Sequence, residues 1–366
     1  MSPRAFALAA FLARAAHAQP APTDTVTLVA AGDIVVHRRV AAAATAHLAD
    51  GGYAWVLGPL RAELPPESIA IANLETPLSE RYRRPGNTTP PVLGADPSLA
   101  AALAATGFDV VSLANNHAYD QTARGLTETL AALRDAGVAS AGAGASNTDA
   151  DRPVVLRRGA VRVALLAFTD RVNSGPGAGA SAVALGFSPD GRRTRAALRA
   201  ARASADVVVL SIHWSRDFVY APTPAQRAQA RAWIDAGADV ILGTGPHVLQ
   251  RVERLASPRG EAVVAWSLGN LLSNQGWRHR PGLAAPSRTS PEDCPYARDG
   301  ALLRVTFVRD GARLRVGTLT AVPLWTENDG ATTLRAAPLR TADVTVRTER
   351  RAAIATALGA AVTLLE

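Results

Sequence analysis

Residues that can bind a metal or transfer a proton follow one apolar segment after another along this chain. They are Asp33, Glu75, Asn116 with His117, His213, His247 and Asn270. A strand needs no Asp, Asn or His at its carboxyl end, and in open α/β sheets ligands bind at that edge. The recurrence therefore predicts one shared site, in which carboxylate, amide and imidazole groups act together.

Two of these residues are histidines that each close an apolar run. His213 follows VVVLSI, and His247 follows VILGTGP. Neutral imidazole is a common ligand of Zn, Mn and Fe. A single histidine of this kind is usually structural, but two of them together with Asp33 and Asn116 favour a divalent metal site.

The carboxylates are ambiguous when each is taken alone. Asp33 follows Gly32, and a Gly-Asp pair at a strand end either lets a metal approach closely or forms an ordinary turn. Glu75 either supports a metal or caps the segment that follows it. His37 is either a further nitrogen ligand or a solvent-facing residue at the start of a helix, and we favour the solvent-facing position.

The segment Ala114-Asn115-Asn116-His117 carries the most specific chemistry. Two consecutive amides and an imidazole are poor material for a core, but Asn116 can offer an oxygen ligand and His117 a proton. Asp120 can orient His117 by accepting its other ring proton. The alternative is an Asn-rich capping turn, and we favour the catalytic interpretation.

The elements that must position these residues alternate along the chain. Apolar runs of strand length lie at residues 25–31, 69–73, 110–114, 161–169, 207–212, 240–243 and 263–268. Helical patterns lie at residues 97–106, 125–136, 194–204 and 224–236. This order predicts an α/β fold with a mostly parallel or mixed sheet covered by helices.

The remainder of the chain is less regular. Residues 300–324 read as two alternating strands around Asp310-Gly311, which is a hairpin pattern. The loop at 274–299 is either a flap over the site or a disordered insertion. It contains the single cysteine, Cys294, for which we expect a free surface thiol and no ligand role. Residues 350–365 are predicted to form a docked helix.

Composition narrows the classes of partner. The chain has 366 residues, and its hydrophobic content of 48% excludes a disordered protein. The net charge of +8 comes entirely from arginine, because the sequence contains no lysine. Basic clusters such as Arg83-Arg84 lack the interleaved aromatic residues of a strand-binding groove, so we predict no nucleic-acid partner.

The N-terminus has the pattern of a secretion signal. Arg4 precedes a short apolar region at 5–12, and Ala16-His17-Ala18 provides small residues for cleavage after Ala18. A transmembrane helix needs ~20 apolar residues, so this region is too short to span a bilayer. We therefore expect a signal peptide at 1–18 and an exported protein, periplasmic or extracellular. The alternative is an uncleaved tail.

Several ordered segments together resemble a known family. They are AGDIVVH, IANLETPL, SLANNHAYDQTARGL, LSIHW, ADVILGTGPHVLQRVE and AWSLGNLLSNQ. They are similar to the CapA family of capsule or poly-γ-glutamate biosynthesis proteins, which is related to the calcineurin-like metallophosphoesterases. The resemblance implies a four-layer α/β/β/α sandwich of mixed sheets with a metal site at the strand ends. We expect this domain at residues 26–325 and a C-terminal extension at 326–366 that packs on it.

The resemblance also implies a role for each site residue. Asp33 and His247 would hold one metal, Asn116 and His213 would hold the other, and Glu75 would occupy the bridging position. His117 would be the proton donor.

The sequence departs from the family pattern at two places. Gly245 stands where the family has a histidine before Pro246, and Ser215, Arg216 and Asp217 follow His213-Trp214 where a glycine and a nearby glutamate are usual. A ligand of the second metal is therefore missing, and fewer imidazoles weaken metal binding.

Two functions follow from these features. The first is a hydrolase of phosphoester-type bonds that uses one or two ions of Mn, Zn or Fe. The second is a non-catalytic factor that binds an anionic surface polymer such as poly-γ-glutamate and has a degenerate metal site. Both would act in polymer synthesis or export, alongside membrane-bound synthesis or export proteins.

Overall fold

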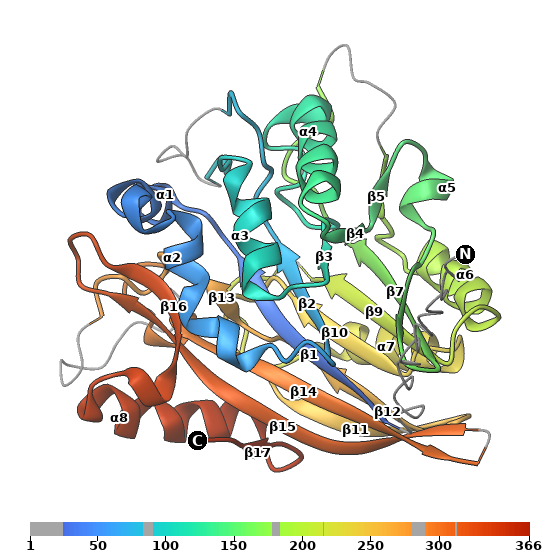
Figure 1. Cartoon of the computed structure of the whole chain (residues 1–366). Helices are drawn as coiled ribbons and strands as arrows, with labels where there is room; N and C mark the ends of the chain where they lie inside the picture. Colours follow the sequence, from blue (N-terminus) through green and yellow to red (C-terminus); the bar gives the residue numbers. More distant parts are fainter. Residues whose placement is uncertain (1–24, 83–90, 178–183, 215, 280–289, 312) are drawn as a thin grey trace, which may run out of the picture.

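Two β-sheets pack face to face at the centre of the protein, and helices cover their outer faces (Figure 1). The computed structural model describes residues 25–82, 91–177, 184–214, 216–279, 290–311 and 313–366. The predicted signal peptide at 1–18 lies outside the described residues. The four-layer α/β/β/α sandwich expected from the family resemblance is confirmed.

The first sheet combines a parallel half with an antiparallel half. Its strand order is β16 (Leu334–Pro338), β15 (Arg313–Asn328), β14 (Asp299–Asp310), β1 (Thr25–Ile34), β2 (Ile69–Leu74), β3 (Val110–Ser112) and β4 (Ala139–Ala141). Strands β1 to β4 are parallel, whereas β14 pairs antiparallel with both β1 and β15. The predicted hairpin is therefore confirmed, and it extends the sheet beside β1.

Short strands complete this sheet. Strand β13 (Asn270–Leu272) pairs with β1, and β17 (Thr363–Leu364) pairs with β15. A separate small pair joins β5 (Ala143–Gly144) to β8 (Ala184–Leu185).

The second sheet has a parallel centre with antiparallel edges. Its order is β11 (Val252–Ser257), β12 (Gly260–Ala265), β10 (Val240–Thr244), β9 (Val207–His213), β7 (Val161–Thr169) and β6 (Val154–Arg158). Strands buried on both faces read as continuous apolar runs, which is why β7, β9 and β10 were recognisable in the sequence.

Helices bury an apolar side against each sheet. On the first sheet lie α1 (Arg38–Ala46), α2 (Tyr53–Leu57), α3 (Ser98–Thr106) and α4 (Thr122–Asp135). On the second lie α6 (Arg192–Arg202) and α7 (Pro224–Asp235), while α5 (Asn147–Ala150) is a short helix beside β5. Thr223 and Gln226 form a capping box at the start of α7, which explains its sharp N-terminal boundary.

The C-terminal segment differs from its prediction. Helix α8 spans Val344–Leu358 instead of 350–365, because Asp343 caps its start and Gly359 adopts φ +80 at its end. Residues beyond Gly359 then form β17. Ile354 and Leu358 join the main core, and β15 runs continuously across the boundary placed between residues 325 and 326.

Cys294 was expected at the surface but is fully buried, and its Sγ lies 3.1 Å from the hydroxyl of Tyr220. Cys294 packs with Phe218, Val248 and Ala297 in a small apolar cluster, and residues 280–289 of the predicted loop lie outside the described residues. Within the described part of the chain, no helix combines the length and hydrophobicity needed to cross a membrane.

Candidate metal centre at the strand ends

The residues singled out in the sequence lie at the carboxyl ends of neighbouring parallel strands. Asp33 lies near the end of β1, Glu75 directly follows β2, and His213 is the last residue of β9. Asn116, His117 and Asp120 lie in the turn after β3, and His247 lies in the loop after β10; all these side chains are buried.

Glu75 lies at the centre of a set of three imidazoles. Its Oε1 atom is 3.6 Å from Nε2 of His213, 3.8 Å from Nε2 of His247 and 4.0 Å from Nε2 of His117. These separations are longer than the donor–acceptor distance of a hydrogen bond. Two ligands that each lie ~2.1 Å from a tetrahedral ion would be ~3.4 Å apart, so the spacing suits ligands that share a cation.

Several buried atoms of this cluster have no hydrogen-bond partner among the described residues. They are both carboxylate oxygens of Glu75, Nε2 of His213 and Oδ1 of Asn116. A buried polar atom without a partner costs about 1–3 kcal/mol. Because the orphaned atoms are all lone-pair donors of types that bind divalent ions, the residues fit the metal that the family resemblance implies. One ligand atom from each of Asp33, Glu75 and His247 also lies within 4.8 Å of the other two.

Neighbouring side chains orient these donors. Thr244 Oγ1 lies 3.0 Å from Nδ1 of His213, which leaves Nε2 directed toward Glu75. Asn73 donates its amide N–H to Oδ1 of Asp33 at 2.8 Å. Sequence reasoning did not assign a role to Thr244 or Asn73, although both are polar residues at the ends of apolar strands.

His247 is held in a strained backbone conformation. Its φ is 58°, in the left-handed region that a non-glycine residue rarely adopts. Its Nδ1 lies 3.1 Å from Oδ2 of Asp33 and 3.1 Å from Oδ1 of Asn270. The sequence marked Asn270 as a polar strand end without a role, and this contact together with its amide N–H bond to the His247 carbonyl oxygen helps to hold His247 in place. Strain of this kind is concentrated at functional sites.

Gly245 takes part in the site through its backbone. Its N–H donates to Oδ2 of Asp33 at 3.0 Å. Its φ is +100, and a Cβ added there would lie 2.6 Å from the carbonyl oxygen of Trp214 and 3.0 Å from Nε2 of His213. The histidine of the family pattern therefore has no room here unless the backbone moves.

The second departure from the family pattern lies at the edge of the site. Arg216 and Asp217 are exposed, while Ser215 lies outside the described residues. Arg216 is thus not buried among the candidate ligands. Asp217 is nevertheless close enough to raise the pKa values of Glu75 and His247, after the larger effects of burial and nearer charges.

His117 and Asp120 form a close pair beside the carboxylate cluster. His117 Nδ1 lies 2.7 Å from Oδ2 of Asp120, and the same oxygen accepts the backbone N–H of Leu93 at 2.6 Å. The other ring nitrogen, Nε2, lies 3.4 Å from the side-chain nitrogen of Asn173. Asn173 was missed in the sequence because it lies in an irregular segment four residues after the apolar run at 161–169. Its backbone N–H also donates to the carbonyl oxygen of Asn116 at 2.8 Å.

Burial and charge pull the pKa values of this site apart. Burial lowers the pKa of His213 to about 3, although Asp33 opposes the shift. Burial also disfavours the charged form of His247, but Glu75 and Asp33 outweigh it and raise its pKa to about 10. Burial raises the pKa of Glu75, and the adjacent Asp33 adds to the effect. A divalent cation would stabilise the charged form of both carboxylates.

His37 occupies a different position from the one expected. It is half-buried at the start of α1, and its Nδ1 accepts the backbone N–H of Asn274 at 3.3 Å. Burial lowers its pKa to about 3, with smaller contributions from His247 and His117. It thus borders the cluster instead of facing solvent.

Comparison with known proteins identifies one family and several relatives. Residues 27–275 match the model of the bacterial capsule synthesis protein PGA_cap family. The capsule biosynthesis protein CapA of Bacillus anthracis is 35% identical over 194 residues, which cover 50% of this chain and 45% of that protein. The PGA biosynthesis protein CapA of Bacillus subtilis is 31% identical over 256 residues, which cover 69% of this chain and 65% of that protein.

These matches therefore span about half to two thirds of the relatives' own length. Among solved structures, a calcineurin-like phosphoesterase from Bacillus subtilis is 10% identical, with a TM-score of 0.43, and the match covers 90% of this chain and 96% of that one. This likeness is too remote to carry functional information.

Proposed function

Because this chain belongs to the bacterial capsule synthesis protein PGA_cap family, we propose that it acts in the synthesis or export of an anionic polymer such as poly-γ-glutamate. The family match at residues 27–275 and the names of the two Bacillus relatives support this role. The pattern at residues 1–18 supports export to the periplasm or the cell exterior. Membrane-bound synthesis or export proteins are the partners that such a role requires.

We further propose that the strand-end cluster is a divalent-metal site for hydrolysis of a phosphoester-type bond. The observation that carries this proposal is the set of buried donor atoms without partners, on Glu75, His213 and Asn116. Together with Asp33 and His247, these residues would hold Mn, Zn or Fe. A bound divalent ion would lower the pKa of a water molecule and polarise the bond under attack.

His117 is the group that would move a proton in this reaction. Asp120 accepts from the Nδ1 side of the ring, so Nε2 is the atom available for exchange with a substrate oxygen. In its protonated form, Nε2–H would donate to the leaving oxygen. In its neutral form, Nε2 can accept the amide N–H of Asn173, which holds the ring in place.

A non-catalytic polymer-binding role is the second candidate function. Gly245 favours it, because the imidazole expected at that position is absent and the surrounding backbone leaves no space for one. A site that has lost a ligand binds metal more weakly. The protein would then keep the fold and bind the polymer, but it would not hydrolyse a substrate.

Metal content and turnover, measured together, distinguish the two functions. Purified wild type would be compared with His247→Ala by elemental analysis and with a chromogenic phosphodiester assay. His47→Ala is the matched control, because His47 stacks on Trp55 and pairs with Asp50 away from the cluster. Near-stoichiometric metal and turnover that are lost only in His247→Ala would establish a metallohydrolase. A metal-free, inactive wild type would contradict the metallohydrolase proposal and favour the polymer-binding role.

A further inference from the structure

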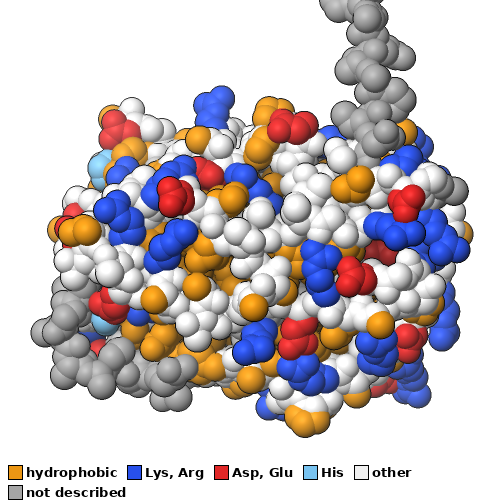
Figure 2. Space-filling model, turned by 90° about the horizontal axis from the view of Figure 1, so that it is seen from below, with side chains coloured by type: hydrophobic (Ala, Val, Ile, Leu, Met, Phe, Trp, Pro, Cys, Tyr) orange, Lys and Arg blue, Asp and Glu red, His pale blue; other side chains and the backbone are white. Residues whose placement is uncertain are grey.

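A groove lies beside the C-terminal end of the chain. It has a volume of about 900 Å³ and is bounded by β15, η4 (Leu339–Thr341), α8 and the segment around β17. Apolar side chains of Val322, Leu339, Val362 and Leu364 line it. Figure 2 views the protein from the side on which α8 and β17 lie in Figure 1, and it shows arginine side chains interspersed with hydrophobic ones.

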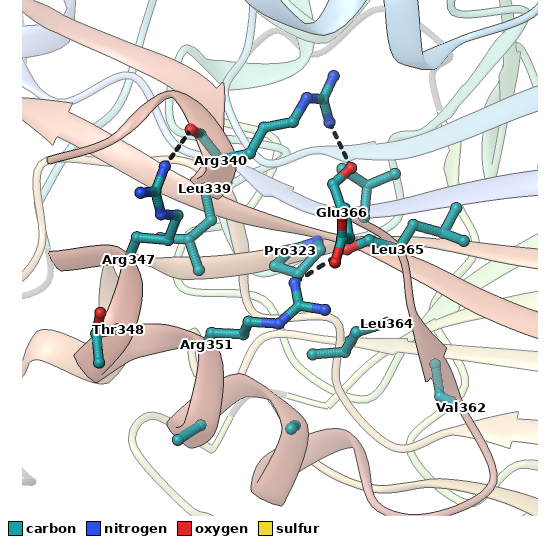
Figure 3. A pocket seen from close by; sticks show the side chains of 13 residues that line it. Pro323, Leu339, Arg340, Arg347, Thr348, Arg351, Val362, Leu364, Leu365 and Glu366 are labelled. Carbon is teal, nitrogen blue, oxygen red and sulfur yellow. Dashed lines mark hydrogen bonds between the residues drawn. The ribbon is translucent and has the colours of Figure 1, made fainter. Parts of the chain in front are cut away.

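Arginine side chains surround this groove (Figure 3). Arg340 forms an ion pair with Glu63 and donates to the main-chain oxygen of Glu366 at 3.3 Å. Arg347 donates to the carbonyl oxygen of Arg340 at 3.2 Å. Arg351 donates to the carbonyl oxygen of Leu365 at 3.1 Å. Among the described residues that line the groove, three therefore carry guanidinium groups and one, Glu366, is acidic.

Two of these charges are not neutralised within the described protein. Neither Arg347 nor Arg351 forms an ion pair with a carboxylate of the residues that the structure describes. Each guanidinium has five N–H donors, and the hydrogen bonds to Arg340 and Leu365 use one nitrogen of each. Because the two residues are four positions apart on α8, their Cβ atoms lie ~6 Å from each other on one face.

We propose that this groove binds a polymer that carries a carboxylate on every repeat, of the polyglutamate class. The planar guanidinium fork matches a carboxylate with two parallel hydrogen bonds, and adjacent arginines can engage successive carboxylates. The apolar wall formed by the partly exposed Val362 and Leu364 suits the methylene groups between the carboxylates. The described residues that line the groove include no aromatic side chain on which nucleic-acid bases could stack. The choice of polymer rests on the proposed function.

The groove lies outside the part of the chain that matches the family model. That match ends at residue 275, whereas the groove is built from residues between Val322 and Glu366. It also involves none of the strand-end residues proposed to hold metal. A polymer bound here would be retained by the protein independently of the chemistry at the metal site.

Fluorescence anisotropy with labelled poly-γ-glutamate tests the groove on the full chain. The variant is Arg347→Glu with Arg351→Glu. The control is Arg157→Glu with Arg199→Glu, which changes the net charge equally at exposed arginines on β6 and α6. At low salt we expect at least about tenfold weaker binding in the groove variant and less than about twofold in the control, with unchanged metal content and melting.

Two outcomes would overturn the proposal, and a third would support it by separating the groove from the metal centre. If wild type binds the polymer and the two double variants weaken it equally, the attraction is general charge and the groove is not the site. If wild type binds phosphatidylserine vesicles but no polyglutamate, the groove faces a membrane, and the polymer role loses its support as well. Binding that survives His247→Ala but not the groove substitutions would separate this site from the metal centre.

Discussion

Oε1 of Glu75 lies 3.6 Å from Nε2 of His213, and neither atom has a hydrogen-bond partner among the described residues. The distance is too long for a proton to be shared between them. Both side chains are buried, so bulk water does not reach either atom. An arrangement that costs free energy in this way is explained if a cation completes it, because a cation stabilises both lone pairs at once.

Glu75→Gln tests that explanation with almost no change in shape. The substitution removes the charge at the centre of the cluster, and a neutral amide is a much weaker ligand than a carboxylate. We expect metal affinity to fall by roughly 10–100-fold, as for loss of a supporting group at a metal site. Isothermal titration with Mn or Zn would measure it. Affinity equal to that of wild type would remove Glu75 from the metal site.

His117→Gln and Asp120→Asn should separate chemistry from metal binding. If His117 donates the proton, its replacement lowers kcat by roughly 10²–10⁴-fold while the metal remains bound. Asp120→Asn should cause a smaller loss of kcat and shift the pH profile, because Asp120 contacts the opposite ring nitrogen at 2.7 Å. Elemental analysis alongside the assay would check this. Metal loss in either variant would contradict a purely proton-transferring role.

The sequence predicted the strands and the cluster well because both depend on local pattern. Asp33, His213 and His247 stand out as polar residues directly after long apolar runs. Parallel strands bring such positions to one edge, so their proximity followed from the element order. The extent of β1 and β9 was underestimated for the same reason, since the strands continue into the polar residues themselves.

The parts that the sequence did not reveal depend on contacts between distant segments. Asn173 lies in an irregular segment, and nothing in its neighbourhood indicates that it faces His117. Cys294 lies between polar and proline residues, which favours exposure, yet tertiary packing buries it. The lack of space for a side chain at Gly245 arises from the carbonyl oxygen of Trp214, which the parallel pairing of β9 and β10 brings close.

Gly245→Ala should destabilise the protein beyond the cost of its backbone conformation. A left-handed φ costs an L-residue about 1–2 kcal/mol. At Gly245, the added Cβ would also lie 2.6 Å from the carbonyl oxygen of Trp214. Gly260→Ala is the matched control, because Gly260 has φ +116 and no atom within 4 Å of the added Cβ. Urea unfolding should show the larger loss at Gly245. Equal losses of unfolding free energy at the two glycines would refute the steric argument. We also expect that the Gly245→His variant binds no more metal than wild type.

The buried ion pair between Asp299 in β14 and Arg350 in α8 should hold α8 against the first sheet. The guanidinium donates to both carboxylate oxygens, and both side chains are buried. Removing one partner of a buried pair costs about 3–5 kcal/mol because the other charge is left uncompensated. We expect this loss for Arg350→Ala, with partial recovery in Asp299→Asn combined with Arg350→Met.

Chemical denaturation would measure these variants. The exposed pair of Arg315 and Asp310 serves as the comparison, and its removal should cost less than about 1 kcal/mol. A loss for Arg350→Ala no larger than this would show that the buried pair does not hold α8.

The stability of metal-free protein should fall in acid, partly because of His213. Burial lowers the pKa of His213 to about 3 in the folded chain, whereas an unfolded histidine titrates near ~6.5. Between these values the unfolded chain binds a proton that the folded chain does not. The contribution of His213 is therefore fully present above pH ~6.5 and is lost as the pH falls toward 3, by about 1.4 kcal/mol per pH unit. His213→Gln should reduce the pH slope of the unfolding free energy by that amount between pH ~5.5 and ~4. Urea titrations of EDTA-treated protein would measure it, and identical slopes would mean that His213 is protonated in the folded state.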